Sequence, residues 1–140
     1  MRKGSKTQIL VVDDDGSIRE TLGMLLSSAG YDVATADNGI NAVSHLSNSA
    51  PDLIVTDLNM PHMSGVELIS HVRSRHPSVS IVAMSGSYQG DAVAAGVIAD
   101  RFYLKGQPSH NLLATIASLI ATSPDRESVQ DNRTRPALDS

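Results

Sequence analysis

The stretch Ile9-Leu10-Val11-Val12-Asp13-Asp14-Asp15 places four apolar residues directly before three carboxylates. Its apolar residues do not alternate with polar ones, which indicates a strand buried on both faces, as in a parallel sheet. A second run of this kind, Leu53-Ile54-Val55-Thr56, ends at Asp57. If the two strands are parallel neighbours, Asp13, Asp14 and Asp57 meet at their carboxyl ends.

Carboxylates that lie this close repel one another and raise one another's pKa unless a cation is present. A divalent ion bound by oxygen atoms removes the repulsion, and Mg²⁺ is the usual one. The sequence therefore predicts a metal site at Asp13, Asp14 and Asp57, with Mg²⁺ as the expected ion and Mn²⁺ as the alternative. Taken alone, the first three acids could instead form an N-cap cluster at a helix. Asp15 is assigned to that cap rather than to the metal.

The composition is that of one globular domain. The chain has 140 residues, which suffice for one core and are too few for two domains of ordinary size. Hydrophobic residues make up 41% and aromatic residues 3%, so the core is expected to be aliphatic. The net charge of −4 argues against nucleic acid as a partner, and the absence of Cys excludes disulfides and thiolate metal sites. No apolar stretch suits a signal peptide or a membrane span, so we expect a cytoplasmic protein without a membrane partner.

Short apolar runs alternate with helix-period segments along the whole folded part of the chain. The expected strands are 9–12, 32–36, 53–56, 80–84 and 102–104. This alternation predicts an α/β fold with a doubly wound, five-stranded parallel sheet and about five helices. Ligands bind such sheets at the carboxyl ends of the strands. Ser85 and Lys105 also follow strands, so they are expected to join the acids there.

The domain organisation is read from composition. Residues 1–6 form a basic N-terminal extension, and residues 7–121 form the folded domain. Residues 122–140 contain almost nothing apolar, so burial could not offset the entropy of ordering them. We therefore expect a polar, disordered tail.

With these residues identified, the chain resembles the receiver (CheY-like) domain of two-component response regulators from about Thr7 to Ala121. The resemblance rests on several separate elements: Asp13-Asp14, the segment Asp57-Leu58-Asn59-Met60-Pro61 with Ser64-Gly65, Ser85, Phe102 and Lys105. It implies a sheet of strand order 2-1-3-4-5. It also implies a stand-alone switch, because the remaining sequence offers no output module.

The resemblance assigns the central role to Asp57, which would accept a phosphoryl group from a sensor histidine kinase or a histidine phosphotransfer protein. Asp13, Asp14 and Asp57 would bind the metal together with the backbone carbonyl of Asn59. Such a domain is a phosphoacceptor switch rather than an enzyme, with only self-catalysed phosphotransfer and dephosphorylation.

The same resemblance implies how the signal leaves the domain. Lys105 and Ser85 would contact oxygens of the phosphoryl group. Ser85 and Phe102 would then act as the switch, changing a surface that an unknown downstream protein recognises.

Three positions depart from the pattern of similar domains. Gly106 replaces a proline that is typically preceded by a cis bond, and a cis bond before glycine costs about 2.5–4 kcal/mol, so we predict a trans Lys105–Gly106 peptide. The segment between Ser85 and Lys105 is short and contains Gly96, which predicts a short or irregular fourth helix. Phe102 lacks the hydroxyl of the commoner tyrosine.

Other functions remain open at this point. A degenerate receiver could act as a scaffold that binds partners without phosphate, as the departure at Gly106 suggests. A small phosphatase or phosphotransferase could use Asp57 on external substrates. Ser85 could be an ordinary turn residue and Lys105 a solvated surface lysine. The chain could also be a segment of a larger protein.

Overall fold

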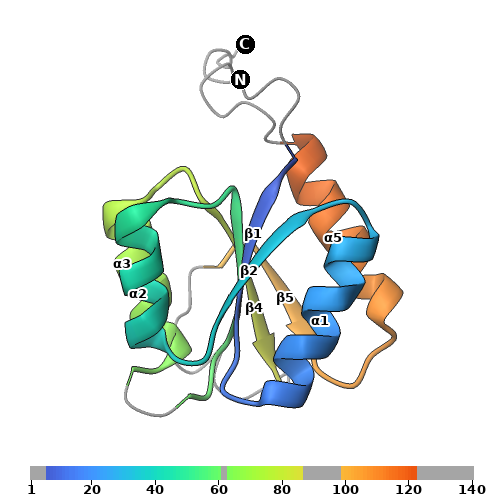
Figure 1. Cartoon of the computed structure of the whole chain (residues 1–140), viewed down its shortest axis with the longest axis horizontal. Helices are drawn as coiled ribbons and strands as arrows, with labels where there is room; N and C mark the ends of the chain where they lie inside the picture. The colour runs from blue at the N-terminus through green and yellow to red at the C-terminus, as the bar shows by residue number, and fades with distance from the viewer. Residues whose placement is uncertain (1–5, 61–62, 87–98, 123–140) are drawn as a thin grey trace.

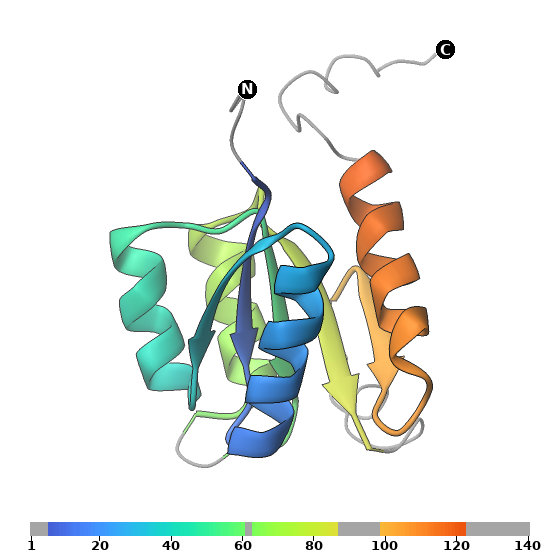
Figure 2. The ribbon, with the colours of Figure 1, turned by 45° about the vertical axis from the view of Figure 1, so that its right-hand side comes forward.

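A computed structural model describes residues 6–60, 63–86 and 99–122. Their centre is a sheet of five strands in the order β2-β1-β3-β4-β5. All four pairs of neighbouring strands are parallel, and Figure 2 shows the arrowheads directed toward one end of the molecule. The strands are β1 (Gln8–Val12), β2 (Asp32–Ala36), β3 (Leu53–Asp57), β4 (Ser80–Ser85) and β5 (Arg101–Leu104). The predicted fold class and strand order are confirmed.

Four helices cover the two faces of this sheet. They are α1 (Gly16–Ser28), α2 (Gly39–Asn48), α3 (Gly65–Arg75) and α5 (Ser109–Thr122). Helices α2 and α3 lie on one face, and α1 and α5 lie on the other (Figure 1). The predicted irregular fourth helix falls on residues 87–98, outside the described part of the chain. The N-terminal extension and the tail also fall outside it, except for residues 6 and 122.

Alternate side chains of each buried strand enter opposite core layers. In β1, Leu10 and Val12 pack with α2 and α3, whereas Ile9 and Val11 pack with α1 and α5. This period of two is the geometry of an extended strand with both faces covered, and it explains the uninterrupted apolar runs. The core is aliphatic as predicted, apart from Tyr103 in the layer under α1 and α5.

Three helices begin at capping side chains in the segments that follow β1, β2 and β3. The Asp15 carboxylate accepts hydrogen bonds from the amides of Ser17 and Ile18 at 2.9 and 3.3 Å. Asn38 caps α2, and Ser64 forms a capping box with Glu67 at the start of α3. Asp15 is therefore a cap, as predicted, and its carboxylate is directed to the helix.

Among the described residues, every helix is too short or too polar to cross a lipid bilayer.

Candidate functional site

Two adjacent central strands bring the acidic residues together. Val12 of β1 pairs with Thr56 of β3, so the residues that follow them, Asp13 and Asp57, are neighbours at the carboxyl ends. Carboxylate oxygens of Asp13, Asp14 and Asp57 lie within 4.8 Å of one another. Asp13 is fully buried and Asp57 is 4% exposed, whereas Asp14 faces solvent. The site is therefore a buried pair of carboxylates with a third at its opening.

A lysine from the far side of the sheet completes the cluster. Lys105 follows β5, and its amide donates to the carbonyl oxygen of Ser85 at 2.8 Å, which continues the strand pairing past the end of the sheet. Its Nζ lies 3.1 Å from Oδ2 of Asp57 and 3.1 Å from Oδ2 of Asp13. Lys105 is therefore not a solvated surface lysine, and its ammonium group bridges the two buried acids.

The protonation of Asp57 reflects opposing influences. Burial raises the pKa of its carboxyl group above the ordinary 3.8, and this effect outweighs the lowering by Lys105 and by the amide of Asn59. The charge of Asp13 raises the pKa of Asp57 further. Burial lowers the pKa of Lys105, but its contacts with Asp57 and Asp13 outweigh burial, so this pKa is raised overall. The ammonium group of Lys105 therefore does not fully offset the free-energy cost of burying Asp57 in its ionised form.

The donor set of the cluster suits a hard divalent cation. Oδ1 of Asp13 accepts from the amide of Asp15 at 2.9 Å. Oδ2 of Asp13 is buried without a hydrogen-bond partner, and the 3.1 Å approach of Lys105 is an ion pair outside hydrogen-bond geometry. When all four groups are ionised, the three carboxylates and the one ammonium group together carry a net charge of −2. The oxygen donors and this charge fit Mg²⁺.

The other predicted site residues lie at the end of β4, on β5 and in the segment after β3. Ser85 is the last residue of β4 and is 6% exposed; it directly follows Met84, the partner of Asp57 in the sheet. The amide of Asn59 donates to Oδ1 of Asp57 at 3.3 Å. Phe102 lies on β5 and is 46% exposed, so the structure places its ring at the surface.

The turn after β5 has a backbone conformation that glycine adopts readily. The Lys105–Gly106 peptide is trans, as predicted. Gly106 has φ +96°, in the left-handed region that favours glycine. From this glycine turn Lys105 reaches both acids.

Two residues that the sequence analysis did not assign to the site support it directly. Gly65 begins α3, and its amide donates to the carbonyl of Leu58 at 3.0 Å. A Cβ at Gly65 would lie 2.6 Å from Cα of Leu58 and closer still to the carbonyl oxygen of Asp57. The guanidinium of Arg19 donates to the carbonyl oxygen of Asp13 at 2.8 Å. The spacing of Gly65 after Asp57 was the sequence signal that could have identified Gly65. No sequence pattern marked Arg19.

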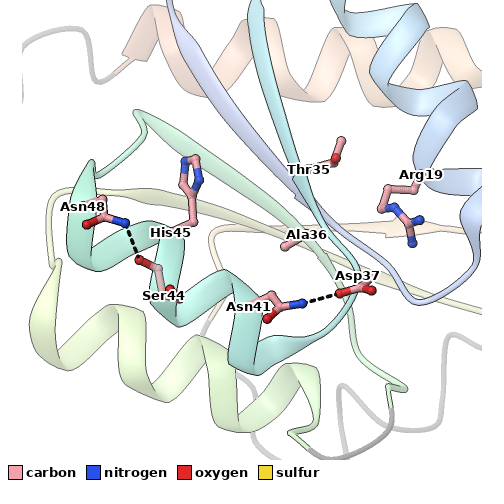
Figure 3. A pocket seen from close by; sticks show the side chains of 8 residues that line it. All are labelled: Arg19, Thr35, Ala36, Asp37, Asn41, Ser44, His45 and Asn48. Carbon is pink, nitrogen blue, oxygen red and sulfur yellow. Dashed lines mark hydrogen bonds between the residues drawn. The ribbon is translucent and has the colours of Figure 1, made fainter.

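An open hollow of about 470 Å³ lies between α1, β2 and α2 (Figure 3). Polar side chains dominate its lining: Arg19, Thr35, Ala36, Asp37, Asn41, Ser44, His45 and Asn48. Asn41 and Asp37 bond to each other across one end at 2.6 Å. The lining contains none of the three clustered acids, so the hollow is separate from the site.

The family model of the response regulator receiver domain matches residues 9–117 of the chain. Among curated proteins, response regulator MprA of Mycobacterium sp. (strain KMS) is 36% identical over 121 residues, covering 84% of this chain and 53% of MprA. The DNA-binding transcriptional regulator NtrC of Escherichia coli K12 is 34% identical over 87 residues, covering 62% of this chain and 19% of NtrC. The chain thus spans about half the length of MprA and less of NtrC.

Solved structures show the same fold. The response regulator TrrA of Thermotoga maritima, crystallised in complex with Mg²⁺-BeF, superposes with a TM-score of 0.73 at 30% identity, covering 81% of this chain and 98% of TrrA. The chemotaxis protein CheY4 of Vibrio cholerae superposes with a TM-score of 0.75 at 30% identity, covering 81% of this chain and 98% of CheY4.

Proposed function

Because this chain belongs to the response regulator receiver family, we propose that it is a phosphorylation-activated switch of a two-component system. In this proposal Asp57 accepts a phosphoryl group from a phosphohistidine, on a sensor histidine kinase or on a histidine phosphotransfer protein. The observation that carries the proposal is the 3.1 Å approach of the Lys105 ammonium to the carboxylate of Asp57, at the buried end of a central strand.

The proposed reaction moves one phosphoryl group. A carboxylate oxygen of Asp57 attacks phosphorus, so an O–P bond forms while the N–P bond of the donor histidine breaks. The imidazole nitrogen keeps the electron pair of the broken bond. Lys105 supplies a positive charge beside the incoming phosphoryl oxygens, and Ser85 supplies a hydroxyl donor from the adjacent strand end. Positioning and charge neutralisation carry most of the catalysis of such transfers.

The residues that would hold Mg²⁺ are Asp13, Asp14 and Asp57, with the backbone carbonyl of Asn59 as the further ligand. Their fit rests on the clustered oxygens and on the buried Oδ2 of Asp13, which lacks a hydrogen-bond partner. The bound ion would neutralise negative charge on the phosphoryl oxygens. TrrA, which the chain resembles, was crystallised with Mg²⁺-BeF, and this supports a divalent ion at the corresponding place.

The signal would leave the domain through protein contacts near β4 and β5. Ser85 would move toward the phosphoryl group, and Phe102, which is 46% exposed, would gain room to turn inward. The net charge of −4 supports a protein rather than nucleic acid as the direct partner of this domain. The residues before 7 and after 121 are proposed to lie outside the receiver.

Labelling with acetyl phosphate and Mg²⁺, followed by intact mass, tests the function. We expect one added phosphoryl group on the wild-type protein and none on Asp57→Asn. Asp52→Asn is the matched control, because the Asp52 carboxylate accepts a hydrogen bond from the amide of Gln8 at the opposite end of the sheet. This variant should label like the wild type.

Two outcomes would replace the proposal. If the wild type takes up no phosphoryl group at any Mg²⁺ concentration, the scaffold alternative is favoured, as the glycine turn after Lys105 suggests. If the protein releases phosphate from acetyl phosphate continuously at a rate that labelled protein cannot account for, a phosphatase is favoured.

A further inference from the structure

The turn after Lys105 is tied to the core by a phenolic hydroxyl, in addition to the bond from the Lys105 amide to the carbonyl of Ser85. Tyr103 lies on β5, and its hydroxyl donates to the carbonyl oxygen of Gln107 at 2.6 Å. The two residues are four positions apart, on either side of Lys105. The bond therefore closes a loop around the lysine.

The ring of Tyr103 is a rigid anchor for this bond. It is 9% exposed and packs in the core layer beneath α1 and α5, on the opposite face of β5 from Phe102. Burial raises the pKa of its hydroxyl, so the group remains protonated and can donate throughout the neutral range. A buried tyrosine usually pairs its hydroxyl with an acceptor, and here that acceptor is the backbone of the turn.

The turn itself has weak internal support. Gly106 and Gln107 are exposed, and Gly106 contributes no side chain to packing. The amide of Gln107 donates to the carbonyl of Leu104 at 3.2 Å, a long bond, and Gly106 sits at φ +96°. A glycine in such a turn can sample other conformations at little cost. The turn needs an external contact to keep one conformation.

Lys105 depends on that conformation. Its ammonium is placed 3.1 Å from both Asp57 and Asp13 at the end of a four-carbon stem with many rotamers. A small displacement of its backbone moves the charge away from both carboxylates, and misplacement by about 1 Å can cost on the order of 10²-fold in rate.

We propose that Tyr103 is a positioning residue for phosphoryl transfer, because its hydroxyl holds the Lys105–Gln107 turn and so directs Lys105 at Asp57. The inference rests on the proposed function, since it concerns the rate at which Asp57 is phosphorylated. The hydroxyl of Tyr103 donates to Gln107 rather than to either acid, so Tyr103 acts through Lys105.

The test compares Tyr103→Phe with the wild type. The substitution removes the hydroxyl and keeps the ring in the core. We expect labelling by acetyl phosphate and Mg²⁺ to slow by about threefold to tenfold, the range that one net hydrogen bond supplies. The Mg²⁺ concentration that gives half of the thermal stabilisation should stay within about twofold, because the acids are untouched. A general loss of structure would move both measurements.

Hydrogen exchange supplies a local signature. In Tyr103→Phe the amides of Lys105 and Gln107 should exchange faster, while those of Ile54 and Val82 in the central strands keep their protection. Tyr31→Phe is the matched control, because Tyr31 also packs partly buried beside α1 and α5 and no described residue is bonded to its hydroxyl. It should change neither the labelling rate nor the exchange at the turn.

The outcomes separate the two proposals. If the wild type labels and Tyr103→Phe labels at the same rate, or slows no more than Tyr31→Phe, the positioning role is wrong. Slower labelling with unchanged exchange at Lys105 and Gln107 also overturns it. If the wild type itself takes up no phosphoryl group, the proposed function fails.

Discussion

The backbone of Gly65 lies directly against the carbonyl oxygen of Asp57. Gly65 is the first residue of α3, and a Cβ there would meet backbone atoms of Asp57 and Leu58 at distances that side chains do not adopt. The absence of a side chain thus lets the helix begin against the end of β3. This contact holds in place the strand end that presents the carboxylate.

Gly65→Ala should destabilise the domain by about 1–3 kcal/mol, because the new methyl group must displace backbone atoms. Urea unfolding without divalent ions measures the change. The matched control is Gly23→Ala in α1, where the nearest atom to a new Cβ is a methyl carbon of Thr35 at 3.9 Å. That change should stabilise by up to about 1 kcal/mol through helix propensity. Equal effects at the two positions would contradict the close contact.

Mg²⁺ should raise the melting temperature of the wild type and fail to do so in Asp14→Ala. Binding to the folded state alone stabilises it by about 2.7 kcal/mol at a concentration 100 times the Kd. Without Mg²⁺ the variant should be at least as stable as the wild type, because one carboxylate is removed from the cluster.

Asp15→Ser serves as the control for this experiment. Asp15 adjoins Asp14 but caps α1, and serine keeps the cap. This variant should retain the full response to Mg²⁺. An equal response in Asp14→Ala would refute the metal assignment.

Asp57→Asn should stabilise the metal-free domain at neutral pH. Burial raises the pKa of Asp57 above 3.8, so the folded state binds a proton more readily than the unfolded state does. The wild type therefore gains stability relative to the variant as pH falls through the raised pKa, and the gain is complete below 3.8. Urea unfolding of both proteins in a chelator, over this pH range, measures the difference. An advantage of the variant that grows on acidification would show that the pKa is lowered instead.

Gly106→Ala should reduce both stability and labelling. A side chain at φ +96° costs about 1–2 kcal/mol, or the turn changes conformation to avoid that cost. Gly30 is the control, since its φ is +102° and a Cβ there also meets no atom within 4 Å. Gly30→Ala should lose a similar amount of stability in urea while the folded protein labels at the normal rate. Slow labelling in both variants would mean that strain, not the aim of Lys105, limits the reaction.

Much of the fold could be predicted from pattern alone. The uninterrupted apolar runs indicated strands covered on both faces, and the cap at Asp15 marked where a helix begins. The acidic cluster could be predicted because parallel strands place their carboxyl ends at one edge. Ser85 was expected there for the same reason, and it lies at that edge, buried at the end of β4.

The arrangement around Lys105 could not be predicted in this way. The sequence alone does not give the position of the Lys105 ammonium group. This group lies at the end of a four-carbon side chain, next to the turn that contains Gly106. The hydroxyl of Tyr103 reaches Gln107 only because the turn folds back over the face that buries its ring. The surface position of Phe102 likewise depends on what covers the edge of the sheet.

By itself the sequence determined a parallel α/β sheet and the convergence of its acids, because strand periodicity and strand direction are local properties that repeat along the chain. Only the tertiary structure decided that Lys105 bridges Asp57 and Asp13, that Gly65 packs on the end of β3, and that a buried tyrosine holds the lysine turn. The first two contacts join residues from separate elements, and the third joins a strand to the turn that follows it. Their distances depend on how helices and turns pack against the sheet, which no periodicity along one segment encodes.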